Sequence, residues 1–305
     1  MDLDVVVIGS LNRDISVLTP RLPVPGESVT GREHFFGPGG KGANQAVAAA
    51  RLGARVAMVG RVGADDYGAA LVSGLQKERI DVSAVAVDEA AATGIAVITI
   101  DDEAENTIVV SPGANMRLTS DQVHEHAGVI ATAPVVLVQL EVPMDAVLAA
   151  AEVATGLFCL NPAPARPLPR TLLDRIDVLV PNRSELAILT DSREPADVTE
   201  AIAAARRLGH EGATVVTLGG EGAVIVDGDR ATEVPAPEVA AVDPTGAGDA
   251  FCGALAGQLS RGRPLEQAVE WAVAAGALAA TRRGAQDAMP TLHEVEALVS
   301  GDSLP

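Results

Sequence analysis

Short runs of aliphatic residues recur along the chain, and each run ends in glycine or leads into a polar residue. The runs are DVVVIG, RVAMVG, PVVLVQL, GLFCLN, IDVLVPN and ATVVTLG. A strand covered on both faces of a sheet has this continuous apolar pattern. Segments of helical period lie between the runs, for example NQAVAAARLGA and VTEAIAAARRLG. Such alternation predicts an α/β fold with a mostly parallel central sheet flanked by helices.

Two segments interrupt this alternation. Residues 14–37 have β character with proline–glycine turns, and residues 93–112 are typical of two strands joined by an acidic turn. We expect them to form a small separate β-sheet, used as a lid over a site or as a dimer contact. No linker or repeat divides the chain, so residues 1–305 are predicted to be one domain. Its last third is predicted to be helical, over 247–260, over 264–283 and from Thr291.

Charge and composition exclude several classes of partner. The formal net charge is −19, whereas nucleic-acid-binding and membrane-surface proteins need a basic face. A small phosphorylated ligand stays possible, because backbone N–H groups and bound cations can hold a phosphate locally. Aromatic residues make up only 2% of the chain, so its core must consist of Val, Ile, Leu and Ala.

The cysteines and the N-terminal segment indicate the compartment. Cys159 and Cys252 are too few for a disulfide framework or a metal quartet, and they are expected to be buried thiols. The sequence MDLDVVVIGS lacks the basic start of a signal peptide, and no apolar run approaches the ~20 residues of a membrane span. We therefore expect a cytoplasmic protein without membrane contact.

Polar residues and glycines follow the predicted strands where ligands usually bind. In open α/β sheets the ligand lies outside the carboxyl ends of the strands. The residues found at such ends are Asn12, Asp14, Glu141, Asn161, Asn182 and Gly219. A shared rim of this kind predicts one site along this edge of the sheet.

The segment AVDPTGAGDAFCGAL, residues 241–255, has the strongest chemical signal. Gly246, Ala247 and Gly248 precede a helical run, so their N–H groups would form an anion hole at a helix N-terminus. Asp249 would lie in the first turn, where a carboxylate can accept the proton of a hydroxyl group. A simple helix cap would need one aspartate and no glycines. The segment therefore favours a kinase that phosphorylates alcohols.

Three further motifs each have a structural and a functional interpretation. GPGGKG is either a plain glycine loop before an Asn44-capped helix or a loop that approaches a ligand, and it fits neither the Walker A nor the dinucleotide spacing. In PNRSE, Asn182 and Glu185 form either a capping box or a site near hydrated Mg²⁺. TLGGEGA is either a hairpin turn or a loop against a nucleotide phosphate.

Taken together, GGKGANQA with Gly53, and DPTGAGDAF, resemble the paired signature motifs of the ribokinase-like (phosphofructokinase-B-type) carbohydrate kinases. The similarity covers nearly the whole chain, because GSLNRD, PGESVTG, VQLE, NPAPA, PNRSE, TLGGEGA and TRRGAQ follow in family order. The resemblance implies that family's central sheet with a small β lid. It also implies a homodimer that forms through the lids.

The resemblance assigns roles to residues of the sugar and phosphoryl sites. Asp249 would take the proton of the sugar hydroxyl, and Gly246, Ala247 and Gly248 would supply the anion hole. The residues that would hold the sugar are Asn12, Arg13, Asp14, Gly40, Lys41, Gly42, Ala43, Asn44, Glu141 and Asp249.

The resemblance also assigns the nucleotide and cation sites. The ATP site would consist of Asn182, Thr217, Leu218, Gly219, Gly220, Glu221, Gly222 and Gly248, with Glu185 arranging Mg²⁺ through water. An activating K⁺ would be held by Asp243 and by the carbonyls of Thr245, Ala279, Arg282 and Gly284. The chain departs from the family pattern at Pro244, Val273 and Ala288, which puts the strength of K⁺ activation and of base recognition in question.

The implied activity is ATP-dependent phosphorylation of the 5-hydroxyl of D-ribose. The alternatives are a kinase of 2-deoxyribose, of another sugar or of a nucleoside, and a non-catalytic sugar sensor on the same scaffold. A nucleoside would need aromatic stacking, for which Phe35 and Phe36 are the only adjacent pair. A sensor would not need Asp249. A dinucleotide-dependent oxidoreductase would need a glycine fingerprint after the first strand, which the sequence lacks.

Overall fold

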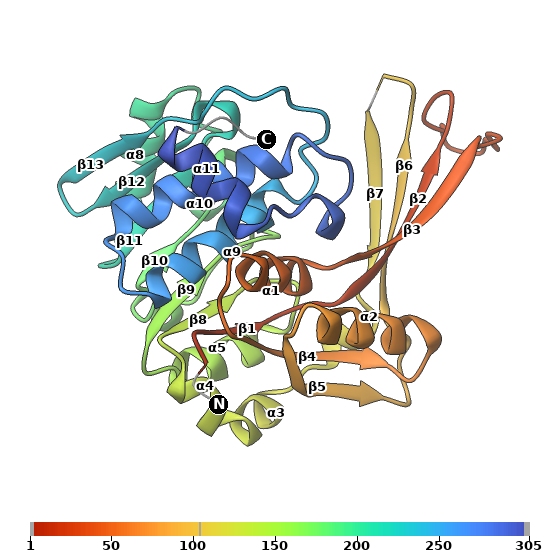
Figure 1. The fold of residues 1–305 in the computed structure, drawn as a ribbon, viewed down its shortest axis with the longest axis horizontal. Coiled ribbons are helices and arrows are strands. Elements are labelled where there is room, and N and C mark those ends of the chain that lie inside the picture. The colour runs from red at the N-terminus through yellow and green to blue at the C-terminus, as the bar shows by residue number, and fades with distance from the viewer. Residues whose placement is uncertain (1–2, 104, 302–305) are drawn as a thin grey trace.

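The strands form two separate sheets (Figure 1). The structure is a computed structural model and describes residues 3–103 and 105–301. The larger sheet has nine strands in the order β13-β12-β11-β10-β9-β8-β1-β4-β5. Their bounds are β1 Val5–Ile8, β4 Val56–Gly63, β5 Asp81–Asp88, β8 Val135–Val138, β9 Leu157–Leu160, β10 Val178–Leu179, β11 Ala213–Thr217, β12 Ala223–Asp227 and β13 Arg230–Val234.

The pairing within this sheet confirms the predicted mostly parallel architecture. All neighbouring pairs from β5 across the sheet to β11 are parallel, and only the pairs β11–β12 and β12–β13 are antiparallel. The six predicted runs became β1, β4, β8, β9, β10 and β11. The edge strand β5 was not among the predicted runs, and its residues are a mixture of buried, half-buried and exposed positions.

Helices cover both faces of the large sheet. Their bounds are α1 Lys41–Arg51, α2 Asp66–Lys77, α3 Ser120–Glu125, α4 Ala127–Thr132, α5 Met144–Val153, α6 Arg170–Leu173, α7 Arg183–Leu189, α8 Val198–Arg207, α9 Ala247–Ser260, α10 Leu265–Ala279 and α11 Leu292–Ser300, with short 3₁₀ turns η1 Gly113–Arg117, η2 Gly219–Glu221 and η3 Gln286–Ala288. In the described part of the chain, none of these helices has the length and hydropathy that crossing a membrane requires.

The residues of β1 alternate between the two faces. Val5 and Val7 pack in the core cluster that contains α1, α9 and α10, whereas Val6 and Ile8 pack in the cluster that contains α3, α4 and α5. This strand is therefore apolar at every position because both of its faces are covered by helices.

Two predicted helix boundaries were wrong. The helix expected to start at Asn44 begins at Lys41, because Gly40 has a φ of 89° and ends the preceding extended segment. The helix expected over 264–283 ends at Ala279. The carbonyl of Ala280 instead accepts hydrogen bonds from the N–H groups of Val242 and Asp243, at 2.7 and 3.1 Å.

Helices α1 and α9 cross in close backbone contact. A Cβ placed on Gly253 of α9 would lie 2.4 Å from the carbonyl oxygen of Gln45 and 2.6 Å from Ala48 Cβ. Only glycine permits this approach. Both helices lie on the same face of the large sheet (Figure 1), so the crossing fixes their first turns relative to each other.

The smaller sheet extends away from the body of the molecule (Figure 1). It has the order β3-β2-β6-β7, with β2 Asn12–Leu18, β3 Glu33–Gly39, β6 Gly94–Ile100 and β7 Asn106–Ser111. Its strands come from the two segments that interrupt the alternating pattern, which confirms the prediction of a separate small sheet. We call it the β lid.

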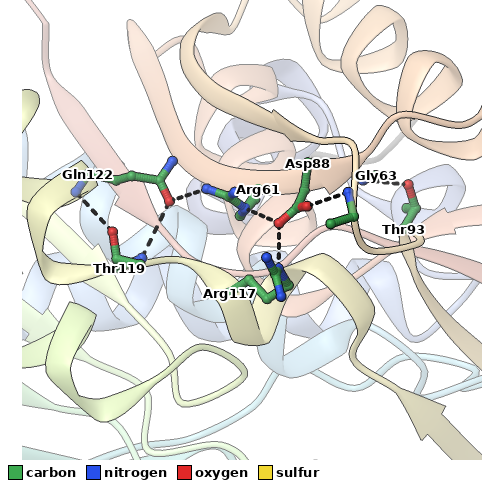
Figure 2. A network of polar contacts seen from close by, with 8 residues as sticks. Arg61, Gly63, Asp88, Thr93, Arg117, Thr119 and Gln122 are labelled. Atoms are coloured by element: carbon green, nitrogen blue, oxygen red, sulfur yellow. Dashed lines mark hydrogen bonds and ion pairs between the residues drawn. The ribbon is translucent and has the colours of Figure 1, made fainter.

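A buried aspartate ties the end of the β lid to the large sheet (Figure 2). Asp88, the last residue of β5, accepts hydrogen bonds from Arg61 Nε at 2.7 Å and from Arg117 Nε at 2.6 Å. The hydrogen bond from Arg117, aided by those from the Ala90 N–H and Arg61, lowers the pKa of Asp88. Because Arg117 belongs to η1, which follows β7, this network anchors the point where the chain leaves the lid.

The entry to β6 is anchored in a similar way. Thr93 Oγ1 accepts a hydrogen bond from the Gly63 N–H (Figure 2) and donates one to Asp65 Oδ1, at 2.9 and 2.6 Å. Asp65 is also the N-cap of α2. The lid segment that starts at Thr93 is therefore held to the body at both ends.

Candidate active site

A cavity of about 230 Å³ lies at the carboxyl ends of the parallel strands. The predicted rim residues Asn161 and Asn182 line it, directly after β9 and close after β10, together with Thr217 at the end of β11. The first turns of α1 and α9 close it on the other side with Lys41, Gly246, Gly248 and Asp249, and Glu185, Val180, Pro244 and Cys252 complete the lining. Two of the six predicted rim residues therefore line this cavity, whereas Asn12, Asp14, Glu141 and Gly219 are not part of its lining.

The start of α9 has the geometry of an anion-binding helix terminus. Gly246 is the N-cap with a φ of 77°, and Ala247 is the first helical residue. A Cβ on Gly246 would approach Ala285 Cα to 3.0 Å. A helix N-terminus presents unpaired N–H groups and a partial positive charge, so it favours an anion. Asp249 lies in the first turn beside these groups and is 7% exposed.

The Asp249 carboxylate is held by two amides of α1. Asn44 Nδ2 donates to Asp249 Oδ2 at 2.9 Å, and Gln45 Nε2 donates to Asp249 Oδ1 at 3.0 Å. The sequence singled out Asn44 as a sugar ligand, whereas it gave Gln45 no role. Both side chains reach Asp249 because α1 and α9 cross at Gly253.

The residues predicted to hold the sugar lie mostly around the base of the β lid. Asn12 is the first residue of β2 and pairs with Gly39 on one side and Gly94 on the other. Its Oδ1 accepts a hydrogen bond from Asn115 Nδ2 at 2.7 Å, and Asn115 had no sequence signal. Glu141, three residues after β8, accepts hydrogen bonds from Ser10 Oγ and from the Lys41 N–H.

Three other predicted sugar ligands, Arg13, Gly42 and Ala43, make packing contacts with neighbouring residues of the chain. Arg13 lies over the rings of Phe36 and Tyr67, at 5.5 and 5.9 Å from its guanidinium carbon. Gly42 is packed against the backbone of residues 9 and 10, where a Cβ would meet Ser10 N at 2.6 Å. Ala43 is buried in the core, and its N–H donates to the Ser10 carbonyl.

Asp14 lies among like charges. Its carboxylate lies so close to Gly39 that a Cβ there would be 2.2 Å from both of its oxygens. Burial, followed by the negative charges of Glu141 and Asp249, raises the pKa of Asp14 from 3.8 to about 7. The folded protein therefore retains this proton over a pH range in which the unfolded chain has lost it.

This shift predicts a pH-dependent effect of Asp14→Asn. Since the folded state binds more protons between about pH 4 and 7, the wild-type free energy of unfolding falls as the pH rises through that window. At pH 8 the asparagine variant is expected to melt several degrees above the wild type, because it lacks the buried charge. Near pH 4, at the lower end of that window, the two melting temperatures should nearly coincide. Thermal melts of the ligand-free proteins test this, and an equal difference at both pH values would contradict it.

Lys41 lies in the cavity, with Asn182, Glu185 and Thr217. The Asp249 carboxylate raises the pKa of Lys41 against the opposing effect of burial, with a smaller contribution from Glu141. The prediction placed Lys41 among the sugar ligands. It lines the same cavity as Gly246 and Gly248 at the start of α9.

The predicted nucleotide residues flank the same cavity. Asn182 caps α7 in a capping box with Glu185, so the structural interpretation of PNRSE is correct, and Glu185 also lines the cavity. Burial raises the pKa of Glu185. Asn182 also forms an isolated parallel bridge with Thr217.

The glycine-rich turn after β11 lies beyond the lining of this cavity. TLGGEGA forms the hairpin between β11 and β12, including η2, so the hairpin interpretation is correct as well. Gly219 and Gly220 have open space where a Cβ would lie, Leu218 is buried, and Glu221 pairs with Arg183. Gly222 has a φ of 98° and lies against the backbone of residues 234–236.

The predicted cation ligands lie in two loops that meet. Asp243 accepts hydrogen bonds from the N–H groups of Thr245 and Gly284, at 2.9 and 3.0 Å. Burial by itself would raise the pKa of Asp243, but these hydrogen bonds outweigh it and lower the pKa. Ala279 ends α10, and Arg282 pairs with Glu294.

The residues predicted to hold K⁺ thus offer one carboxylate, which accepts two backbone hydrogen bonds, and backbone carbonyls. In the described residues no cluster of three His, Cys, Asp or Glu side chains that could hold a metal was found, and a K⁺ site built from carbonyls does not need one. Ala288 is buried in η3, and Val273 belongs to the core cluster.

The comparisons with known proteins identify a family over nearly the whole chain. Residues 2–292 match the model described as pfkB family carbohydrate kinase. A ribokinase of Schizosaccharomyces pombe is 38% identical over 96% of this chain and 97% of its own length. A deoxyribokinase of Salmonella typhi is 35% identical over 98% of this chain and 99% of its own. The structure of Arabidopsis thaliana ribokinase complexed with ribose and ATP has a TM-score of 0.88 and 31% identity, covering 98% of this chain and 99% of that one.

Proposed function

Because this chain belongs to the pfkB family of carbohydrate kinases, we propose that it is an ATP-dependent ribokinase. The reaction transfers the γ-phosphoryl group of ATP to the 5-hydroxyl of D-ribose and releases D-ribose 5-phosphate and ADP. The ribokinases among its relatives and the ribose and ATP bound in the Arabidopsis structure support this choice of substrates. The observation that carries the proposal is the position of Asp249, held by two amides beside the α9 N-terminus and facing the cavity.

The proposed transfer assigns a role to each group at the start of α9. Asp249 takes the proton of the sugar hydroxyl as the oxygen–phosphorus bond forms. The bond between the γ-phosphorus and its bridging oxygen breaks, and its electron pair leaves with ADP. The N–H groups after Gly246 stabilise the negative charge on the equatorial phosphoryl oxygens. Lys41, which lies in the same cavity, is positioned to neutralise part of that charge.

The sugar and the nucleotide would bind on opposite sides of these groups. The sugar would contact Asn12, Asp14 and Glu141 below the β lid, where short polar side chains suit adjacent hydroxyls. The nucleotide would lie along Asn182, Thr217 and the glycine-rich turn of η2. Closure of the β lid would exclude water, which favours transfer to the sugar over hydrolysis of ATP.

Two cations complete the proposed site. Mg²⁺ would be arranged through water by Glu185, and K⁺ would be held by Asp243 with the carbonyls of Thr245, Ala279, Arg282 and Gly284. When bound, Mg²⁺ would supply positive charge at the phosphates, and K⁺ would add positive potential to the loop beside the anion hole. The meeting of the two loops through Asp243 supports the K⁺ assignment.

We further propose a cytoplasmic homodimer that forms through the β lid. One face of the lid has exposed aliphatic residues, since Val109 is 69% exposed and its cross-strand partner Val97 is 38% exposed. An apolar sheet face of this kind usually marks an interaction surface. Both cysteines are buried free thiols, as expected in a reducing compartment.

The first experiment measures ADP release from MgATP with ribose, 2-deoxyribose, fructose and adenosine, and without an acceptor. Each reaction is run with K⁺ and with Na⁺ alone. We expect the highest turnover with ribose, a clear increase with K⁺, and little release without an acceptor. The proposed function predicts this whole pattern.

Each departure from this pattern has a separate meaning. A preference for 2-deoxyribose, for which the Salmonella deoxyribokinase is a precedent, would keep the mechanism and change the substrate. Ribose turnover that is indifferent to K⁺ would contradict the cation site, and Pro244 and Ala288 would then be the residues to substitute. Sugar binding without any turnover would replace the kinase by a sugar sensor.

A further inference from the structure

The amide that holds Asp249 Oδ1 belongs to a side chain that is fully buried. Gln45 is 0% exposed, so its side chain presents no surface to a bound sugar or nucleotide. Its Nε2 nevertheless donates to Asp249 Oδ1 at 3.0 Å. Asn44, the other donor, is in contrast one of the proposed sugar ligands.

The orientation of the Gln45 amide is fixed by a chain of hydrogen bonds. The Val180 carbonyl can only accept, so Asn161 must direct its Nδ2 toward it, at 2.9 Å, and its Oδ1 toward Gln45. Gln45 Nε2 donates to that Oδ1 at 3.1 Å, and its own Oε1 accepts from Gln139 Nε2 at 2.5 Å. The Asp249 carboxylate can only accept, so its hydrogen bond from Nε2 requires the same orientation of the Gln45 amide.

The backbone of Gln45 is fixed as well. Its carbonyl oxygen lies against Gly253, four residues after Asp249, at the crossing of α1 and α9. The side chain thus leaves a rigid backbone position and ends in an amide whose other contacts are satisfied. Among buried groups, such a network holds its members in one arrangement.

We propose that Gln45 is a positioning residue for phosphoryl transfer, which acts by holding Asp249 in the orientation that accepts the sugar proton. With Oδ1 held by Gln45 and Oδ2 by Asn44, the carboxylate cannot rotate about its Cβ–Cγ bond without breaking a hydrogen bond. The inference rests on the proposed function, because it requires Asp249 to be the proton acceptor.

Gln45→Met tests the proposal, since methionine has similar length and is unbranched but cannot donate to Asp249. We expect kcat to fall by about 10²-fold, because a displacement of ~1 Å at the reacting group has an effect of this size. The KM values for ribose and ATP should change by less than about two-fold, since Gln45 contacts neither substrate. The variant should also melt at a lower temperature, so kinetics are measured well below its transition.

The matched control is Gln258→Met. Gln258 is a fully buried glutamine near the end of α9, and among the described residues its amide atoms have no hydrogen-bond partner. The same substitution there removes an amide from the core without affecting Asp249. Its kcat should equal that of the wild type.

A double-mutant cycle separates positioning from a general structural effect. If Gln45 acts through Asp249, Gln45→Met should cause no further loss in an Asp249→Asn background, where residual turnover is followed with radiolabelled ATP. Losses that multiply in that background, or a Gln45→Met enzyme with wild-type kcat, would overturn the proposal. If Gln45→Met does not fold, Gln139→Met replaces it. That variant removes the donor to Gln45 Oε1, and its smaller loss must likewise disappear in the Asp249→Asn background.

The outcomes also distinguish this inference from the proposed function. Turnover within about ten-fold of the wild type in Asp249→Asn would remove Asp249 as the proton acceptor and the role of Gln45 with it, whereas the kinase activity itself would stand. An inactive Asp249→Asn enzyme together with a fully active Gln45→Met enzyme would remove only the role of Gln45.

Discussion

Asp249→Asn is expected to lower kcat by about 10²–10⁴-fold, the usual contribution of a general base, while the protein still folds and binds ribose. An amide cannot accept the hydroxyl proton, but it occupies nearly the same volume at the start of α9. The change also replaces one acceptor oxygen by a donor, so the new side chain can satisfy only one of the amides of Asn44 and Gln45. A modest drop in melting temperature should therefore accompany the loss of turnover.

Steady-state kinetics, ribose titration calorimetry and circular dichroism measure these effects. Asp66→Asn is the matched control, because Asp66 is also an aspartate in the first turn of a helix, α2. It should leave kcat unchanged. An Asp249→Asn enzyme within about ten-fold of wild-type kcat would refute the assignment of the base.

Gly253→Ala is expected to impair both stability and turnover through a single added methyl group. That methyl would lie 2.4 Å from the Gln45 carbonyl oxygen, so α1 and α9 must move apart. Overpacking of this kind costs about 1–3 kcal/mol. The same movement separates Asp249 from Asn44 and Gln45, and a shift of ~1 Å there should lower kcat by about 10²-fold.

Gly257→Ala is the control for this prediction, because Gly257 lies one turn further along the same helix. A Cβ there meets its nearest neighbour, Ala54 Cβ, at 3.8 Å, which is an ordinary contact. Alanine stabilises a helix interior by about 0.5–1 kcal/mol relative to glycine, so this variant should melt higher with unchanged kcat. Thermal melts and kinetics of both variants measure the difference. A Gly253→Ala enzyme as stable and active as Gly257→Ala would contradict the tight crossing.

The sequence could predict those features that depend on neighbouring residues. The aliphatic runs predicted the parallel strands, and the glycines before Asp249 predicted its place in the first turn of a helix. The edge strand β5 was missed because an edge strand need not be apolar on both faces. The end of α10 was misjudged because its termination depends on a contact with residues 242 and 243, which are distant in sequence.

The hydrogen bonds that hold Asp249 could not be predicted either, because they join residues that are distant in sequence. Gln45 and Asp249 are 204 positions apart, and no local pattern connects them. Gln45, Gln139 and Gln286 all lie within motifs that the sequence analysis quoted, yet a glutamine in an apolar run gives no sign of what it faces. Gln286, for example, donates to Asn44 Oδ1, which only the folded chain shows. The pKa of Asp14 likewise depends on Glu141 and Asp249, which come close to it only on folding.

The division between the β lid and the crossing of α1 with α9 bears on how such a chain can evolve. The proposed sugar ligands Asn12 and Asp14 belong to β2, a lid strand, whereas Asp249 is fixed by the close approach of two core helices. Mutations in the lid strands can alter acceptor preference while the reaction machinery stays intact. Mutations at the helix crossing are expected to disturb the core and the position of Asp249 together. We therefore expect acceptor specificity to diverge more readily than phosphoryl transfer among descendants of this scaffold.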